Sequence, residues 1–311
     1  MIDAGLLNIV NGIFIGRGNF GKNLLEIFTK ATKINWIAFF GSEEYQNSIE
    51  NIWSRIELSD FIVIACPDPF HIGWMQILSL NHYKGMIFCE KSPVVSPQQL
   101  EVLRKIDSEK IYFNFPLTFT KFMVPDLGDE PENKLLMIDW GHKFAFNPVY
   151  LTNWRSKFDL VPYGIGTSLA IHFVHLALYL YGEINNFDVA YSNIAQTGTS
   201  PDSIKIFISF RSKTHVFINC SYAIEETQKL GTNHKDFFPF LNDKKIKQKL
   251  NINLDIDKNQ TNFKDYLSFN PDPFIEGNVK SVNYFINCLR NNKTTNQDKK
   301  IVYKSLELLF T

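Results

Sequence analysis

Residues 12–29 read GIFIGRGNFGKNLLEIFT, and this stretch decides the fold. A short apolar run, residues 12–15, enters a glycine-rich sequence, and residues 23–29 then repeat apolar side chains with helical spacing. The glycine-rich sequence is G-x-G-x-x-G, and its members are Gly16, Arg17, Gly18, Asn19, Phe20 and Gly21. In a strand–turn–helix unit one glycine makes the tight turn, a second lets the backbone approach a pyrophosphate, and the third allows close helix–strand packing. Such turns also occur without a ligand, so the strand before the motif and the helix after it favour dinucleotide binding over a structural turn.

The apolar runs that follow alternate with helical segments. We expect further strands at residues 34–40, 61–65, 86–89 and 111–115, and helices at residues 73–80 and 97–106. Strands that are apolar throughout and alternate with helices indicate a parallel sheet covered on both faces. Residues 1–117 are therefore predicted to form an N-terminal Rossmann dinucleotide-binding domain of an α/β protein.

Beyond Thr118 the pattern changes to strands without intervening helices. Strands are expected at residues 135–139, 188–191, 204–210 and 216–222, beside an apolar helix at 169–181, with closing helices at 278–289 and 302–310. SFRSKTHVF, residues 209–217, has a polar centre and predicts a hairpin, whereas the polar residues 251–264 suggest an exposed hairpin or loop. We expect residues 118–311 to form an α+β domain on a mostly antiparallel open sheet, which binds substrate and mediates oligomerisation.

Composition excludes several classes of protein. Lys and Arg number 32, as do Asp and Glu, so neither nucleic-acid binding nor charge-driven disorder is indicated. No apolar run reaches the roughly 18 residues of a membrane span, and the start lacks the pattern of a signal peptide. A soluble, cytoplasmic protein without a membrane partner is expected. We also expect a homo-oligomer, either a dimer or a tetramer, because a sheet covered by helices on one face leaves its other face to be buried. The scattered cysteines predict buried free thiols in a reducing compartment, and they are Cys66, Cys89, Cys220 and Cys288.

Polar residues follow three of the expected strands at the edge where open α/β sheets bind ligands. Ser42 stands where NAD enzymes usually carry an acid, which favours NADP, whereas Glu43 beside it favours NAD, so the cofactor stays NAD or NADP. A lysine after the fourth strand, Lys91, can hold a substrate oxygen as it becomes an alkoxide, although a surface lysine in a turn is an equal alternative. The other residues at these strand ends are Cys66, Pro67, His71 and Glu90.

A polar stripe runs along the apolar helix at 169–181. Ser168, His172, His175 and Tyr179 are spaced by four, three and four residues, which places them on one helical face. One buried histidine is usually a core residue, but four polar groups on one face indicate a wet cleft, because desolvating them costs free energy. A metal site is disfavoured, because no carboxylate or third ligand accompanies the two histidines.

These segments, in this order, resemble the glucose-fructose oxidoreductase, inositol dehydrogenase and MocA family. IGRGNFGKN (15–23) resembles its phosphate loop, DFIVIACPDPFH (60–71) its D-x-V-x-I-A-x-P-x-x-x-H segment, and CEKSPV (89–94) its E-K-P motif. NWRSK (153–157) followed by GIGTSLAIHFVHLALYLYG (164–182) resembles its W-R…G-G-G-x-L-x-D-x-G-x-H-x-x-D-x-L segment.

The resemblance implies roles for individual residues. Its catalytic lysine and histidine correspond to Lys91 and His172. Cofactor contacts are expected from the six residues of the glycine-rich sequence and from Ser42, Cys66, Pro67, His71, Glu90 and Lys91. Substrate contacts are expected from Lys91, Trp154, Arg155, Ser168, His172, His175 and Tyr179.

Three positions depart from the family pattern. Ser168 and His175 replace aspartates, and Ser92 separates Lys91 from Pro93. Ser168 cannot hold the imidazole with a carboxylate, so an inositol-type substrate is not expected. The activity implied is NAD(P)-dependent hydride transfer at a carbon of a sugar or nucleotide-linked sugar, with Lys91 holding the reacting oxygen and His172 relaying the proton. The alternatives are a catalytically silent NAD(P)-binding sensor or regulatory protein, or an imine or tetrapyrrole reductase.

Overall fold

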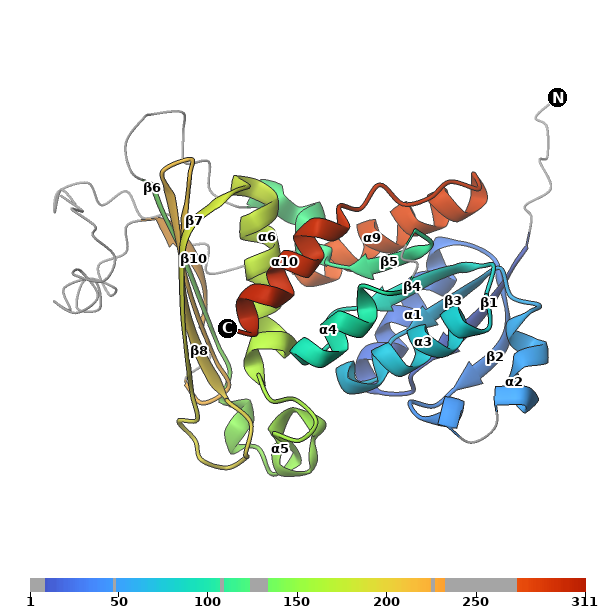
Figure 1. The fold of residues 1–311 in the computed structure, drawn as a ribbon, viewed down its shortest axis with the longest axis horizontal. Coiled ribbons are helices and arrows are strands. Elements are labelled where there is room, and N and C mark those ends of the chain that lie inside the picture. The colour runs from blue at the N-terminus through green and yellow to red at the C-terminus, as the bar shows by residue number, and fades with distance from the viewer. Residues whose placement is uncertain (1–8, 47–48, 107–108, 124–133, 225–226, 233–272) are drawn as a thin grey trace, which may run out of the picture.

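The computed structural model describes residues 9–46, 49–106, 109–123, 134–224, 227–232 and 273–311. Two five-stranded sheets lie at opposite ends of the molecule, with helices packed between them (Figure 1). The predicted combination of a parallel sheet followed by a mostly antiparallel sheet is confirmed.

The first sheet is parallel and has the strand order β2-β1-β3-β4-β5. Its strands are β1 (Val10–Ile15), β2 (Ile34–Phe40), β3 (Phe61–Ile64), β4 (Met86–Glu90) and β5 (Ile111–Asn114). Every residue of β3 and β5 is buried, because helices cover both faces. The apolar runs of the sequence are therefore strands of the kind expected for a doubly covered parallel sheet.

Helices from both ends of the chain cover this sheet. One face carries α3 (His71–Leu80) and α4 (Pro97–Leu103), and the other carries α1 (Asn19–Ala31). The last long helix but one, α9 (Pro273–Arg290), packs beside α1 although it is far away in sequence. Phe285 of α9 meets Phe88 of β4 edge to face at a centroid distance of 5.3 Å. The helix predicted at 278–289 within the second domain thus completes the core of the first sheet.

The second sheet has the order β10-β6-β9-β8-β7. Its strands are β6 (Lys134–Gly141), β7 (Ile184–Ser192), β8 (Ser203–Phe210), β9 (Thr214–Ser221) and β10 (Thr227–Thr232). Among the described strands of this sheet, only β6 and β9 pair in parallel, and the predicted hairpin is the β8–β9 connection. The helix α6 (Ile171–Tyr181) packs against β9, as the apolar pattern predicts.

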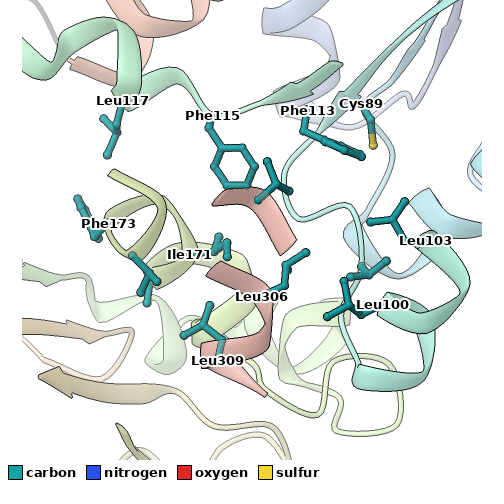
Figure 2. Close-up of a cluster of buried hydrophobic side chains, with 14 of the residues drawn as sticks. Cys89, Leu100, Leu103, Phe113, Phe115, Leu117, Ile171, Phe173, Leu306 and Leu309 are labelled. Atoms are coloured by element: carbon teal, nitrogen blue, oxygen red, sulfur yellow. The ribbon is translucent and has the colours of Figure 1, made fainter. Parts of the chain in front are cut away.

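The space between the sheets is filled by α10 (Lys299–Leu309), which contacts both α4 and α6. Figure 2 shows Leu306 of α10 between Ile171 of α6 and Leu100 of α4. These buried side chains belong to one hydrophobic cluster that reaches from the first sheet to the second. The cluster therefore joins the two halves of the molecule.

Several elements differ from the predictions. The helix at 97–106 ends at Leu103, and a π-helical turn, Gly166–Ala170, precedes α6. The sequence pattern missed three short elements, which are α2 (Ile49–Ile56), α5 (Pro148–Thr152) and β10. Residues 251–264 lie outside the described residues. All four cysteines are buried and free, as predicted. In the described ranges we find no helix with the length and apolar character needed to cross a membrane.

Candidate functional site

The glycine turn lies between β1 and α1, and the space available for a side chain differs among its three glycines. Gly16 has a φ of +120°, and a Cβ there would lie 2.5 Å from the backbone of Ala65 at the end of β3. A Cβ on Gly21 would lie 2.9 Å from the carbonyl oxygen of Gly16. A Cβ on Gly18 would meet nothing within 4 Å. Packing therefore requires Gly16 and Gly21, whereas Gly18 leaves open space at the start of α1, where backbone N–H groups favour anions.

A carboxylate stands beside this turn at the end of β2. Glu44 accepts hydrogen bonds from Arg17 at 3.2 Å and from the backbone N–H of Gly41 at 2.8 Å. Arg17 also donates to the carbonyl of Phe39 at 3.1 Å. Ser42, which the sequence aligns with the acid position, is half-buried, and its carbonyl accepts a bond from the Trp74 indole. The carboxylate next to the glycine turn is thus that of Glu44, and neither Ser42 nor Glu43, the two residues expected at this position, supplies it.

His71 connects the loops that follow β3 and β4. Its ring nitrogens lie 2.7 Å from the carbonyl oxygen of Cys66 and 2.8 Å from that of Ser92. Burial lowers the pKa of His71 and raises the pKa of the Cys66 thiol. Because the imidazole is fully buried and its two nitrogens face carbonyl oxygens of different loops, His71 lies where the two loops expected to carry the cofactor meet. Pro67, in the first of these loops, is half-buried.

Glu90 ends β4 and belongs to a buried polar network. Asn114 donates to its carboxylate at 2.8 Å and to the side-chain oxygen of Asn278 at 2.7 Å. Ser281 in turn donates to Asn114 at 2.6 Å, so the network ties α9 to the ends of β4 and β5. Burial raises the pKa of Glu90 to about 7, partly offset by the charge of Lys91. The carboxyl group beside Lys91 is therefore poised to titrate near neutral pH.

Lys91 crosses from the first half of the molecule to the second. The residue is 8% exposed, and its ammonium donates a hydrogen bond to the carbonyl oxygen of Ser168 in the π-helical turn before α6. One helical turn further on, His172 is buried, and its pKa is lowered well below the usual value by burial and then by the charge of Lys91. The Lys91 ammonium is therefore held at the turn before α6, close enough for its charge to act on the His172 imidazole.

Two aromatic rings enclose the histidines of α6. Phe115 stacks on His175 with a centroid distance of 3.9 Å and an angle of 5° between the ring planes. Phe274 meets His172 edge to face at 4.9 Å. Neither ring nitrogen of His175, nor Nδ1 of His172, has a hydrogen-bond partner within the described ranges. Burial lowers the pKa of His175 to about 3, so both rings are neutral at neutral pH.

Ser168 lies between Lys91 and Tyr222, and through Tyr222 it is connected to the region of Trp154 and Arg155. Its hydroxyl lies 2.9 Å from the Tyr222 hydroxyl, and the positive charge of Arg155 partly opposes the burial that raises the pKa of Tyr222. The Arg155 guanidinium lies over the Trp154 ring, 4.1 Å from its centroid.

The predicted stripe along α6 is only partly continuous. Ser168, His172 and His175 are buried, whereas Tyr179 is 45% exposed. The π-helical turn changes the phase of the helix at Ser168, and Tyr179 lies where α6 leaves the core. The expected wet cleft is, in this structure, an enclosed polar cluster with Tyr179 outside it.

Asp68, a buried carboxylate near Glu90, was not among the residues expected at the site. It directly follows Pro67, is buried, and has one carboxylate oxygen without a hydrogen-bond partner among the described residues. Its charge helps to raise the pKa of Glu90. Asp68 lies inside the 60–71 segment that carries the resemblance, whereas Asn114, Tyr222 and Phe274 come from distant segments, and no local pattern marks them.

In the part of the chain that the structure describes, no group of three His, Cys, Asp or Glu side chains is arranged to hold a metal ion. No protein-family profile and no curated protein matches the sequence.

Solved structures do match, at low sequence identity. GenD2 from gentamicin A biosynthesis, in complex with NAD, is 13% identical with a TM-score of 0.69, covering 97% of this chain and 92% of its own. Levoglucosan dehydrogenase, in complex with NADH and levoglucosan, is 12% identical with a TM-score of 0.69, covering 96% and 95%. A myo-inositol dehydrogenase from Corynebacterium glutamicum is 13% identical with a TM-score of 0.63, covering 97% and 94%. The chain therefore has the fold of these oxidoreductases over nearly its whole length, which confirms the expected architecture.

Proposed function

We propose that the chain is an NAD(P)-dependent oxidoreductase that transfers a hydride to or from a carbon of a sugar or nucleotide-linked sugar. The observation that carries the proposal is the reach of Lys91 from the carboxyl end of the parallel sheet, the edge that also bears the glycine turn, to the turn before α6, where its charge lowers the pKa of His172. Ligands of open α/β sheets bind along this edge.

The glycine turn fits the pyrophosphate of a dinucleotide. Gly18 leaves its open side free for phosphate oxygens, and the first turn of α1 carries no acidic side chain that would repel them. Asn19 and Phe20 begin that turn. The loops held together by His71 would carry the nicotinamide half, and NAD or NADP would supply the hydride acceptor or donor when bound. The complexes of GenD2 with NAD and of levoglucosan dehydrogenase with NADH support this assignment.

Glu44 and Arg17 would decide between NAD and NADP. A carboxylate at the end of the second strand accepts the ribose hydroxyls of NAD and repels the 2′-phosphate of NADP. Arg17 beside it is the group that would pair with such a phosphate. Because Glu44 is held by the Gly41 N–H as well as by Arg17, we propose NAD as the better cofactor.

Lys91 and His172 would share the proton chemistry. In the oxidation direction the substrate C–H bond breaks with its electron pair leaving as hydride, the O–H proton passes to the neutral imidazole of His172, and a C=O bond forms. The Lys91 ammonium would stabilise the negative charge that develops on the oxygen. The lowered pKa of His172 keeps the ring unprotonated and ready to accept a proton at neutral pH. Reduction follows the same steps in reverse.

The groups around the pair suit a hydroxyl-rich substrate. Ser168 and Tyr222 offer hydroxyls, and His175 offers ring nitrogens without partners among the described residues. Trp154 and Arg155 together present an aromatic face and a guanidinium, which suit a sugar ring and the phosphate of a nucleotide-linked sugar. Tyr179 would contribute from the outer rim. A cytoplasmic location and a homo-oligomeric state remain predictions from the sequence.

One observation favours a second candidate, a catalytically silent dinucleotide-binding protein. The Lys91 ammonium is already bonded to the Ser168 carbonyl, at a position where the family pattern has an aspartate. A substrate oxygen would have to replace that carbonyl as the acceptor.

A substrate panel separates the two candidates. The purified chain is mixed with NADH or NADPH and a series of keto-sugars and nucleotide-linked keto-sugars, and dinucleotide binding and oxidation are measured in the same samples. Turnover with any member supports the enzyme. Dinucleotide binding without turnover across the panel supports the silent protein, and absence of binding contradicts both.

A further inference from the structure

The opposite edge of the parallel sheet contains a hollow of about 800 Å³ that the proposed function does not use. It lies at the amino ends of the strands, beside Val10 of β1, Asp60 before β3, Met86 of β4 and Lys110 before β5. Leu289 and Arg290, at the end of α9, also line it. The glycine turn and Lys91 belong to the carboxyl ends of the same strands, so the two edges are separate.

The hollow is strongly positive although the chain as a whole is neutral. Its charged lining residues are four cations and one carboxylate, which are Lys84, Lys110, Arg290, Lys293 and Asp60. None of the four cations forms an ion pair with a carboxylate of the described residues. Asp60 is already engaged, because one of its oxygens accepts the backbone N–H of Asn11 at 2.7 Å. A net positive charge therefore faces the hollow.

The positions of these cations are not explained by helix stabilisation. Basic residues often gather at a helix C-terminus because they compensate free carbonyl groups there. At the end of α9, however, the carbonyls of Asn287, Cys288 and Leu289 already accept backbone N–H groups. The Lys110 ammonium donates one hydrogen bond to the carbonyl of Lys84. Within the described ranges, the ammonium groups of Lys84 and Lys293 make no hydrogen bond.

Neighbouring hollows extend the positive charge along this edge. One shares Arg290 and adds Lys33, and another shares Lys84 and Lys110 and adds Lys105. Charges of one sign that line a concavity reinforce one another and attract the opposite charge.

We propose that this hollow, the amino-edge site, binds a small phosphorylated ligand with two or more phosphate groups. Four cations spread around one concavity match more than one phosphate, and the volume is in the range that holds small-molecule ligands. Val10, Met86 and Leu289 supply an apolar wall, which suits a ring attached to the phosphates. The concave shape favours a compact ligand over an extended polyanion.

The test uses the whole chain and two probes, inorganic pyrophosphate and ADP, titrated by calorimetry with and without saturating NADH. Lys293→Glu and Lys84→Glu reverse charges in the amino-edge site. Lys213→Glu, at the exposed β8–β9 turn, is the matched control. We expect ADP to bind the unaltered chain, each amino-edge reversal to weaken binding roughly 10-fold, and added salt to weaken it further. Lys213→Glu and NADH are expected to leave the affinity unchanged.

Three results would overturn the proposal. The first is no binding of either probe up to about 1 mM, an affinity too weak for a specific site. The second is ADP binding that NADH abolishes and the reversals do not change, because that binding belongs to the glycine turn. The third is that RNA or anionic lipid vesicles, but neither small probe, bind through Lys84 and Lys293.

Discussion

Glu90 should make the stability of the protein depend on pH in an unusual direction. Its carboxyl group is buried at the end of β4 and accepts a hydrogen bond from Asn114. Burial raises its pKa in the folded chain from 4.5 to about 7. The stabilising contribution of the protonated form is complete below the unfolded pKa of 4.5 and is lost as the pH rises through 7. Glu90→Gln copies the neutral carboxyl group and should remove this loss.

The magnitude follows from the pKa difference. A change from 4.5 to about 7 is roughly 2.5 pKa units, and each unit corresponds to about 1.4 kcal/mol. The free energy of unfolding of Glu90→Gln, relative to that of the unaltered chain, should therefore be about 3 kcal/mol higher at pH 8.5 than at pH 4.5.

The assay is urea unfolding at a series of pH values between these limits, followed by circular dichroism. Glu50→Gln, an exposed position on α2, controls for the loss of one negative charge. If the stability difference between Glu90→Gln and the unaltered chain does not change with pH, the carboxyl group is not neutral in the folded protein, and the reasoning is refuted.

Four further changes test other parts of the site. Gly16→Ala should destabilise the fold by about 1–3 kcal/mol, because φ is +120° and Ala65 lies too close, whereas Gly18→Ala should keep the stability and lose dinucleotide affinity. Equal effects of both in thermal melts and NADH titrations would contradict these separate roles. Glu44→Ser should shift the ratio of NAD to NADP affinity toward NADP by roughly 10-fold or more, because it removes a charge that repels the 2′-phosphate. An unchanged ratio would remove Glu44 from the ribose site. His175→Phe should reduce the loss of stability on acidification, because the pKa of His175 falls from 6.5 to about 3 and its contribution is lost as pH drops below 6.5. In urea unfolding, the free energy of unfolding of His175→Phe relative to the unaltered chain should be about 3 kcal/mol higher at pH 4 than at pH 7. If the variant and the unaltered chain show the same pH dependence, His175 is not buried in its neutral form.

The first sheet could be predicted because its signals are local. Continuous apolar strands and the glycine-rich turn each lie within one short segment, and the five strands formed where these patterns predict them. The packing of α9 against Phe28 and Phe88 could not be predicted in this way, because helical periodicity reveals an apolar face but not its partner. The short helix α5 and strand β10 carry no clear periodic pattern.

The candidate site also has parts that the sequence predicts and parts that it does not. The position of Lys91 at the end of β4 could be predicted from the strand pattern, whereas the catalytic roles of Lys91 and His172 rest on the resemblance and stay predictions. The Ser168 carbonyl that accepts the Lys91 hydrogen bond could not be predicted, because a backbone acceptor leaves no trace in side-chain identity. The exposure of Tyr179 was missed because regular helical spacing takes no account of the π-helical turn before α6 or of where the helix leaves the core.

The central claim is that the Lys91 ammonium acts on the reacting oxygen, and that any contact it makes with the dinucleotide contributes little to the affinity for it. The direct measurement is the turnover of Lys91→Ala, with the best substrate from the panel, beside its dissociation constant for NADH. We expect turnover to fall by roughly 100-fold or more while the dissociation constant changes by less than about threefold. Unchanged turnover, or a parallel loss of NADH affinity, would contradict it.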